Sequence, residues 1–435
     1  MKKSKKIKKV YVGFAADILH EGHINILKIA KTYGRVIVGL LTDSAIGEYK
    51  KLPHLTYRQR EIVLRNIRYV DELIPQNTLD YVPNLKKIRP DFVIHGDDWK
   101  KGIQKKTREK VIKELKKWSG KLIEPAYTKN ISSTIIRKKI NEVGIAPSTR
   151  ISKLKRLIDS KKIVRILESH SALTGSIIEN LSINKKQNFL EFDGMWSSSL
   201  TDSTLRAKPD NQSVDYTTRI AGLSDILDVT TKPIIFDADN GGRAEHLPYL
   251  IKGLERAGVS AVIIEDKIGL KKNSLFQNQT GVQQDTIKNF SKKISIVKKV
   301  KISSDFLLAA RIESFILGKG INDALKRAKA YSLAGADLIM IHSKEKKPDE
   351  IFKFSKIFSK SKHAKPIIAV PSTYSKTYEK DLIKNGIKIV IYANHMMRSS
   401  YPAMVKTAKL ILSNQRSFET EKNISSVKEM IELID

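Results

Sequence analysis

Residues 259–274 read VSAVIIEDKIGLKKNS, and this stretch decides the fold of more than half of the chain. Its first six residues are mostly β-branched and predict a buried strand. From Glu265 onward it changes to carboxylates, lysines, a glycine and small polar side chains. A strand end that gives up apolar residues for dense, mixed charge is typical of an active site and is poor material for a core.

The same change from an apolar strand to a polar end recurs through the second part of the chain. Helix-length intervals separate the candidate strands, which is the pattern of a (β/α)8 barrel of the TIM type. The chemistry of such barrels takes place at the C-terminal ends of the strands, so we expect the polar ends to converge on one site. The eight candidate strands are at residues 164–168, 189–195, 233–237, 259–265, 307–311, 337–342, 366–370 and 388–392.

Three carboxylates follow two neighbouring strands of this predicted barrel. They are Asp237, Asp239 and Glu265. One such acid alone is more often a solvated loop residue, but three at adjacent strand ends predict ligands, direct or through water, for a hard divalent cation. The chain contains no cysteine, which excludes thiolate ligands and favours Mg²⁺ or Mn²⁺.

Other strand ends predict an anion-binding site. Arg311, Lys271 and His342 offer positive charge or N–H donors, and the serines at 197–199 offer hydroxyls and successive backbone N–H groups. The serines alone would be read as an ordinary loop. A divalent metal beside several anion donors implies a small, multiply charged substrate, such as a phosphorylated keto or enol acid.

Residues from about 153 to 435 resemble phosphoenolpyruvate mutase of the isocitrate lyase superfamily. Lyases of this superfamily carry a catalytic cysteine in the loop after Glu265, and related phosphonopyruvate hydrolases lack the asparagine that stands here as Asn273. The resemblance therefore favours a mutase. Ser197 and Ser199 occupy positions where the family usually has glycines, which affects the geometry expected of the anion hole. The matching segments are 194–200, Asp210, 236–239, 265–274, 310–313, 334–337, 342–344 and 393–395.

The resemblance implies that the barrel interconverts phosphoenolpyruvate and phosphonopyruvate. Asp239 would bind Mg²⁺ directly, with Asp237 and Glu265 acting through water. The loop at 267–274 would close as a lid, because a loose, metaphosphate-like phosphoryl group must be kept from water. The implied substrate-binding residues are Trp196, Ser198, Ser199 and Leu200, and the implied catalytic residues are Asp210, Lys271, Asn273, Ser274, Arg311 and His342.

The first part of the chain predicts a separate, Rossmann-like domain with a parallel sheet. Residues 143–148 have the composition of a linker, so we expect a boundary near residue 147 and domains at 1–147 and 148–435. The expected strands are at 9–14, 35–41, 72–74, 92–95 and 121–124, and the expected helices are at 23–33, 57–66 and 132–142.

The motif His20-Glu21-Gly22-His23 joins the first of these strands to a helix. Two imidazoles three residues apart could form a metal pair, and histidines also commonly cap or pack. The glycine lets a phosphate approach the backbone, and a helix N-terminus favours anions. The stretch from about residue 8 to 139 resembles nucleotidyltransferases of the glycerol-phosphate, choline-phosphate and ethanolamine-phosphate cytidylyltransferase group.

This second resemblance implies that CTP is a substrate and that the histidines stabilise charge at the α-phosphorus. Tyr127 stands where the family has an arginine, so contacts to the nucleotide or the acceptor differ at that point. The implied nucleotide-binding residues are His20, Gly22, His23, Lys50, Lys51, Arg60, Asp97, Ser132, Ser133 and Thr134.

Together the two resemblances predict a bifunctional enzyme of phosphonate biosynthesis, with 2-aminoethylphosphonate as the cytidylyl acceptor. One alternative is a phosphonopyruvate hydrolase or lyase joined to a cytidylyltransferase for phosphocholine or glycerol phosphate. A net charge of +34 raises RNA binding as another, but the lysines are dispersed and aromatic residues make up only 7%. With no apolar run of membrane-spanning length, we expect a cytoplasmic protein that binds small anionic substrates and no nucleic acid. The two resemblances imply a homo-oligomer, a dimer or tetramer.

Overall fold

The structure is a computed structural model that describes residues 7–100, 104–126, 145–185, 188–269, 271–275 and 279–433. The chain forms two compact units. The first comprises the chain as far as Val164 together with Asn180–Asp193, and the second comprises Arg165–Glu179 and Gly194–Asp435. The helix expected at 132–142, with Ser132, Ser133, Thr134 and the preceding Tyr127, lies outside the described residues. The boundary near residue 147 stays a prediction.

A five-stranded parallel sheet with the order β3-β2-β1-β4-β5 forms the centre of the first unit. The strand order reverses beside β1, and in open parallel sheets ligands bind at such a reversal, beyond the carboxyl ends of the strands. The His20–His23 motif follows β1 and therefore lies at this position. The strands are β1 (Lys9–Phe14), β2 (Arg35–Leu41), β3 (Glu72–Gln76), β4 (Phe92–Ile94) and β5 (Lys121–Ile123).

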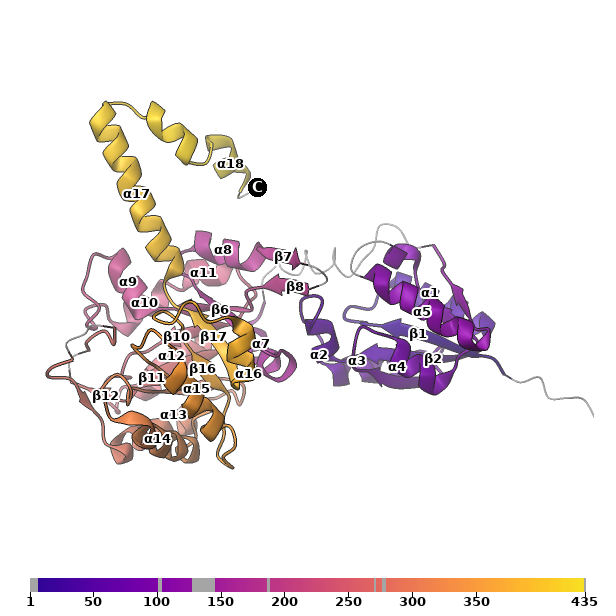
Figure 1. Cartoon of the computed structure of the whole chain (residues 1–435), viewed down its shortest axis with the longest axis horizontal. Helices are drawn as coiled ribbons and strands as arrows, with labels where there is room; N and C mark the ends of the chain where they lie inside the picture. Colours follow the sequence, from indigo (N-terminus) through magenta and orange to yellow (C-terminus); the bar gives the residue numbers. More distant parts are fainter. Residues whose placement is uncertain are drawn as a thin grey trace, which may run out of the picture. The chain divides into compact units, whose positions relative to one another are not determined.

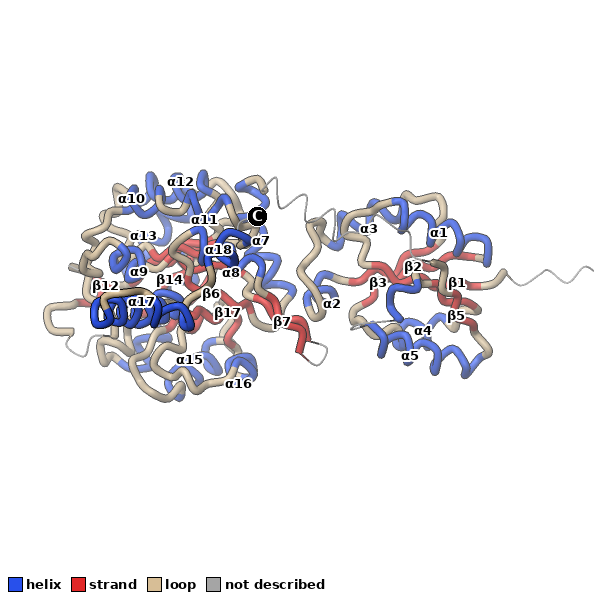
Figure 2. Tube along the Cα trace, turned by 90° about the horizontal axis from the view of Figure 1, so that it is seen from above, coloured by secondary structure: helices blue, strands red, loops and turns tan. Residues whose placement is uncertain are grey.

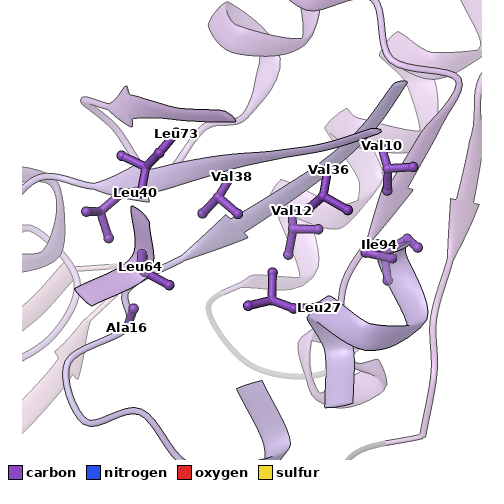
Figure 3. Close-up of a cluster of buried hydrophobic side chains, with 11 residues drawn as sticks. Val10, Val12, Ala16, Leu27, Val36, Val38, Leu40, Leu64, Leu73 and Ile94 are labelled. Atoms are coloured by element: carbon purple, nitrogen blue, oxygen red, sulfur yellow. The ribbon is translucent and has the colours of Figure 1, made fainter. Parts of the chain in front are cut away.

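Helices cover both faces of this sheet, with α1 and α3 on one side and α4 and α5 on the other (Figure 2). Strand alternation divides the core accordingly. Val10 and Val12 pack with Leu27 of α1 on one face (Figure 3), while Tyr11 packs with Leu85 of α4 on the other. The helices of this sheet are α1 (Glu21–Tyr33), α2 (Asp43–Gly47), α3 (Tyr57–Arg65), α4 (Val82–Ile88) and α5 (Lys105–Leu115).

The second unit is built around a closed barrel of eight parallel strands, which confirms the predicted fold class (Figure 1). Its strands are almost wholly apolar and buried, as expected for strands covered on both faces. The strands are β6 (Val164–Glu168), β9 (Gly194–Ser197), β10 (Ile234–Asp237), β11 (Ala261–Glu265), β14 (Leu307–Ile312), β15 (Leu338–Ile341), β16 (Ile367–Ala369) and β17 (Ile387–Tyr392).

The prediction of a single barrel strand at 189–195 is wrong. Its first part belongs to an antiparallel hairpin of β7 (Ser182–Lys185) and β8 (Asn188–Glu191), and the barrel strand β9 begins only at Gly194. A Cβ atom on Gly194 would lie 2.7 Å from the Pro233 carbonyl oxygen and 2.8 Å from Ile166 Cδ1, so only glycine fits where β9 enters between its neighbours.

Helix α17 (His395–Asn414), which follows the last strand, buries none of its residues and extends away from the barrel (Figure 1). None of the described helices is long and apolar enough to cross a membrane. The other helices of this part of the chain are α7 (Pro147–Ser160), α8 (Ala172–Asn180), α9 (Ser199–Leu205), α10 (Tyr216–Ala221), α11 (Ser224–Asp228), α12 (Leu247–Ala257), α13 (Ile287–Val300), α14 (Gly320–Ala334), α15 (Asp349–Phe358), α16 (Glu379–Lys384) and α18 (Val427–Glu432).

Candidate active sites

One pocket at the carboxyl ends of the barrel strands is lined by every residue predicted to be catalytic or substrate-binding in this domain. Of the predicted metal ligands, Asp237 and Glu265 line it too. The convergence follows from the barrel, since each parallel strand presents its last residue at the same end. The predicted residues in the lining are Trp196, Ser198, Ser199, Leu200, Asp210, Asp237, Glu265, Lys271, Asn273, Ser274, Arg311 and His342.

The three carboxylates predicted to bind metal are buried at the ends of β10 and β11. Asp239 has a φ of 51°, a left-handed conformation that a non-glycine residue adopts only under constraint. Its N–H donates to Asp237 Oδ1 at 3.1 Å, and its carbonyl accepts the Glu265 N–H at 2.7 Å. The strained turn therefore places the two aspartates and the glutamate next to one another.

The donor chemistry of this cluster fits a hard cation. Burial raises the pKa of Glu265 to about 7, although the positive charge of Arg311 acts to lower it. Glu265 Oε1 is buried and has no hydrogen-bond partner among the described residues, which suits an acceptor for a metal-bound water. In the part of the chain that the structure describes, no three histidine, aspartate or glutamate side chains are arranged to hold one ion directly. The metal-binding roles of these residues stay a prediction.

Lys271 and Asn273 bring the loop after β11 into the pocket. The Lys271 ammonium contacts Asp239 and the Ser199 hydroxyl, and lies 2.7 Å from Asp210 Oδ1. Asn273 Nδ2 donates to the other oxygen of Asp210 at 2.9 Å. The two loop residues and Asp210 thus form one bonded group in the lining of the pocket.

Arg311 and His342 also line this pocket. Arg311 donates through Nε to Glu313 at 2.6 Å and through Nη2 to the Ser274 hydroxyl at 2.7 Å. Burial lowers the pKa of His342 to about 3, and the neighbouring Arg311 charge acts in the same direction. The imidazole is therefore neutral near pH 7 and can offer a hydrogen bond without carrying charge.

The two serines at family glycine positions fit the backbone without strain. Ser197 and Ser199 are not among the non-glycine residues with positive φ. The Ser199 hydroxyl donates to Asp237 Oδ2 at 3.0 Å, so it adds a contact that glycine could not make.

Arg219 is a functional neighbour that sequence reasoning missed. Its side chain, 1% exposed, reaches from α10 and donates to Asp202 at 2.7 Å and to the Asp237 carbonyl at 2.5 Å. Its guanidinium also lies over the Phe236 ring, 4.3 Å from the centroid. No sequence signal separates this arginine from the many basic residues on surface helices, because only the fold turns it inward.

The first unit has a pocket of about 240 Å³ at the strand-order reversal, and it is lined by His20, Gly22, His23 and Lys50 of the predicted set. Lys51, Arg60 and Asp97 are not among its lining residues. The lining also contains Tyr81, His95, Asp98 and Gln104, which were not among the predicted nucleotide-binding residues, although His95 and Asp98 flank the predicted Asp97 in the sequence.

Arg60, which was expected to bind the nucleotide, contacts other groups of the protein instead of lining the pocket. Its guanidinium is buried, pairs with Asp43 at 2.6 Å and donates to the Ala15 carbonyl. These contacts tie α3 to the loop after β1, so the side chain supports the pocket wall from behind.

The histidine motif forms the start of α1. His20 is the N-cap and accepts the Gly22 N–H on Nδ1 at 3.2 Å, while its own N–H donates to His23 Nδ1 at 3.4 Å. Burial lowers the pKa of both rings, to about 4 for His23, where the neighbouring His20 and Lys50 act in the same direction. Both Nδ1 atoms accept hydrogen bonds, so each neutral ring carries its proton on Nε2 and can donate it to a phosphate.

Comparisons with known proteins match both units. The phosphoenolpyruvate phosphomutase family model matches residues 154–412, and a cytidylyltransferase-like model matches residues 11–139. Phosphoenolpyruvate phosphomutase of Tetrahymena pyriformis is 37% identical over 289 residues, which cover 66% of this chain and 92% of that protein. Glycerol-3-phosphate cytidylyltransferase of Bacillus spizizenii is 35% identical over 96 residues, covering 22% of this chain and 74% of that protein.

A solved structure of phosphonopyruvate hydrolase in complex with oxalate and Mg²⁺ is also similar. It has a TM-score of 0.58 and 30% identity, and covers 66% of this chain and 95% of that one. The chain belongs to the phosphoenolpyruvate phosphomutase family, and it is an isomerase of that family with a nucleotidyltransferase domain of the cytidylyltransferase-like type.

Proposed function

We propose that the barrel interconverts phosphoenolpyruvate and phosphonopyruvate. The observation that carries this proposal is the bonded group of Lys271, Asn273 and Asp210, which lies in the same pocket as Arg311 and His342. These groups supply the pocket with hydrogen-bond donors suited to the oxygens of a phosphoryl group. With no cysteine in the chain, the thiol chemistry of the related lyases has no counterpart here.

The residues divide between the two ends of the substrate. Trp196 and the backbone N–H groups of Ser199 and Leu200 would hold the carboxylate end. Asp239, with Asp237 and Glu265 through water, would hold Mg²⁺ or Mn²⁺, which supplies charge stabilisation to the enolate oxygen when bound. The Mg²⁺ in the similar hydrolase structure supports this part of the proposal.

Phosphorus transfer takes place on the other side of the pocket. The phosphoryl group leaves oxygen through a loose transition state, and Arg311, neutral His342 and Asn273 donate to its oxygens. Asp210, held by Lys271 and Asn273, orients the group or bonds to it transiently, and carbon 3 of the enolate then captures it. The loop at 267–274 acts as the lid that keeps water away.

A coupled assay tests the mutase against the hydrolase alternative. Phosphonopyruvate hydrolysis yields pyruvate, which lactate dehydrogenase reduces directly. Mutase turnover yields phosphoenolpyruvate, which gives a signal only after pyruvate kinase and ADP are added. We expect NADH oxidation to depend on pyruvate kinase, and an equal rate without it would contradict the proposal.

For the first unit we propose transfer of CMP from CTP to a phosphonate, with 2-aminoethylphosphonate as the acceptor. The two neutral histidines at the start of α1, and Lys50 in the same pocket, support binding of a triphosphate. Ser132, Ser133 and Thr134 complete the nucleotide site in this proposal. Pyrophosphate release from CTP is measured with 2-aminoethylphosphonate, phosphocholine and glycerol 3-phosphate. A faster reaction with either phosphate ester would contradict the proposal that 2-aminoethylphosphonate is the acceptor.

We also propose that the protein is a cytoplasmic homo-oligomer. Helix α17 supports the oligomeric state, since it buries no residue while Tyr401, Met404 and Leu412 are 66%, 59% and 79% exposed. A helix with such apolar side chains gains stability by packing against another surface. Light scattering should give at least twice the mass of one chain, and M404E/L412E should lower it. A monomeric wild type would contradict the proposal.

A further inference from the structure

A buried polar cluster lies next to the substrate pocket of the barrel but outside its lining, and Asp266 is its centre. Asp266 Oδ2 accepts hydrogen bonds from Gln284 at 2.9 Å, Tyr331 at 2.7 Å and Arg327 at 3.1 Å. Asp266 Oδ1 accepts the backbone N–H of Glu313 at 2.9 Å. A carboxylate buried among four donors is held in one position, because losing any donor would leave it uncompensated.

This cluster fixes the base of the loop that carries the lid. Strand β12 (Lys267–Ile268) pairs antiparallel with β13 (Gln283–Gln284), with Lys267 opposite Gln284, so the loop leaves and returns through a two-stranded stem. The Asp285 N–H donates to the Asp266 carbonyl at 2.8 Å and closes the stem. Because Arg327 and Tyr331 belong to α14, the cluster attaches this stem to a helix of the barrel.

The same cluster reaches the part of the loop that lines the pocket. Asp266 holds the backbone of Glu313, and the Glu313 side chain accepts the Ser274 hydroxyl at 2.6 Å. Lys267 also donates to the Ser274 hydroxyl, at 2.8 Å. Ser274 directly follows Asn273, so the position of that amide depends on the network behind it.

We propose that Arg327 and Tyr331 are positioning residues that hold the lid in register through Asp266. Neither lines the pocket, so neither is catalytic. Arg327 suits the task because its planar fork binds Asp266, Asp323 at 2.8 Å and the Asp285 carbonyl at 2.8 Å together. Supporting contacts of this kind orient the groups that act directly on a substrate.

The inference rests on the proposed mutase activity and predicts a specific defect. When the lid loop is displaced from its position over the pocket, water reaches the phosphoryl group. The oxygen of water then bonds to phosphorus, the phosphorus–carbon bond breaks, and its electron pair goes to carbon 3. Carbon 3 takes up a proton to give pyruvate, and phosphate is released. Loss of position therefore changes the product as well as the rate.

The test compares R327M with K326M, which also replaces a basic residue with methionine, at the exposed neighbouring position on α14. Phosphate and phosphoenolpyruvate formed from phosphonopyruvate are measured together for each protein. We expect the ratio of phosphate to phosphoenolpyruvate to rise roughly tenfold in R327M, and to stay at the wild-type value in K326M. Trypsin should cut R327M faster after Lys271 or Lys272, with the sites identified by mass spectrometry.

Y331F removes one hydroxyl and provides a milder variant if R327M does not fold. We expect it to shift the product ratio in the same direction by a smaller factor. An unchanged product ratio and unchanged cleavage in a folded variant would overturn the inference. If the wild type forms no phosphoenolpyruvate, the proposed function fails, and the trypsin comparison still decides whether Arg327 positions the loop.

Discussion

At the scale of single residues, the barrel site combines a strained turn with a set of hydrogen-bonded cations. Asp239 adopts a left-handed backbone conformation and contacts Lys271, while Arg311 is bonded to Glu313 and Ser274. The cationic groups of Lys271 and Arg311 are therefore held in position by neighbouring side chains before a substrate enters. Such preorganised charge lowers a reaction barrier because little rearrangement is needed in the transition state.

Replacement of Arg311 tests this arrangement. R311K keeps a positive charge but cannot bond Glu313 and Ser274 with one planar group. We expect the mutase kcat to fall by roughly 10²- to 10³-fold, as for loss of one transition-state donor, with a smaller change in KM. R256K, at an exposed position on α12, is the control. A kcat for R311K within a few-fold of wild type would show that the charge alone is sufficient.

His23 gives a pH-dependent prediction for the first unit. Its folded-state pKa is about 4, below the ordinary value of 6.5, mainly because of burial. Between these values the unfolded chain binds a proton that the folded state does not, so the free energy of unfolding falls as the pH drops from 6.5 to 4. Above pH 6.5 this contribution is constant. Chemical unfolding of wild type and H23Q across this range should show a shallower slope for H23Q, whereas parallel curves would refute the prediction.

At the scale of elements, eight apolar strands with helix-length intervals and polar ends predicted the barrel correctly, because strands covered on both faces are apolar along their length and parallel strands end on the same face. The start of β9 could not be predicted, since it depends on how closely Gly194 approaches Pro233 and Ile166. The contacts of Arg219 and Arg327 could not be predicted from the sequence either, because arginine is usually a surface residue and only the placed helices turn these two inward. The motif residues near the strand ends could be predicted to share one pocket, since the barrel itself brings them together.

The close approach at Gly194 can be tested by adding one methyl group. G194A would place a Cβ 2.7 Å from a backbone oxygen, so the strand must shift. We expect a loss of about 1–3 kcal/mol in the free energy of unfolding, as for other overpacked sites. G253A in α12 is a matched control, because its Cβ would meet only Ile220 Cδ1 at 3.4 Å. It should be neutral or stabilising by up to about 1 kcal/mol. Equal effects of the two changes would contradict the account of β9.

At the scale of the whole molecule, the chain joins two domains, each with its own candidate site. The pocket of the first unit and that of the barrel share no lining residue. We therefore expect H20A to abolish pyrophosphate release from CTP while mutase activity stays within about twofold of wild type, since changes at sites without shared partners act independently. Conversely, D239A should abolish mutase activity while pyrophosphate release from CTP stays within about twofold of wild type. A variant that stops both reactions while remaining folded would show that the sites are coupled.

Phosphorus-31 NMR of the wild-type protein with phosphonopyruvate and Mg²⁺ tests the central claim most directly. One spectrum separates the phosphonate, the enol phosphate and free phosphate, so it follows phosphorus from carbon to oxygen without coupling enzymes. We predict that the phosphonopyruvate signal is replaced by that of phosphoenolpyruvate, with little free phosphate. Conversion to free phosphate alone, or no conversion, would contradict the assignment of the barrel as a mutase.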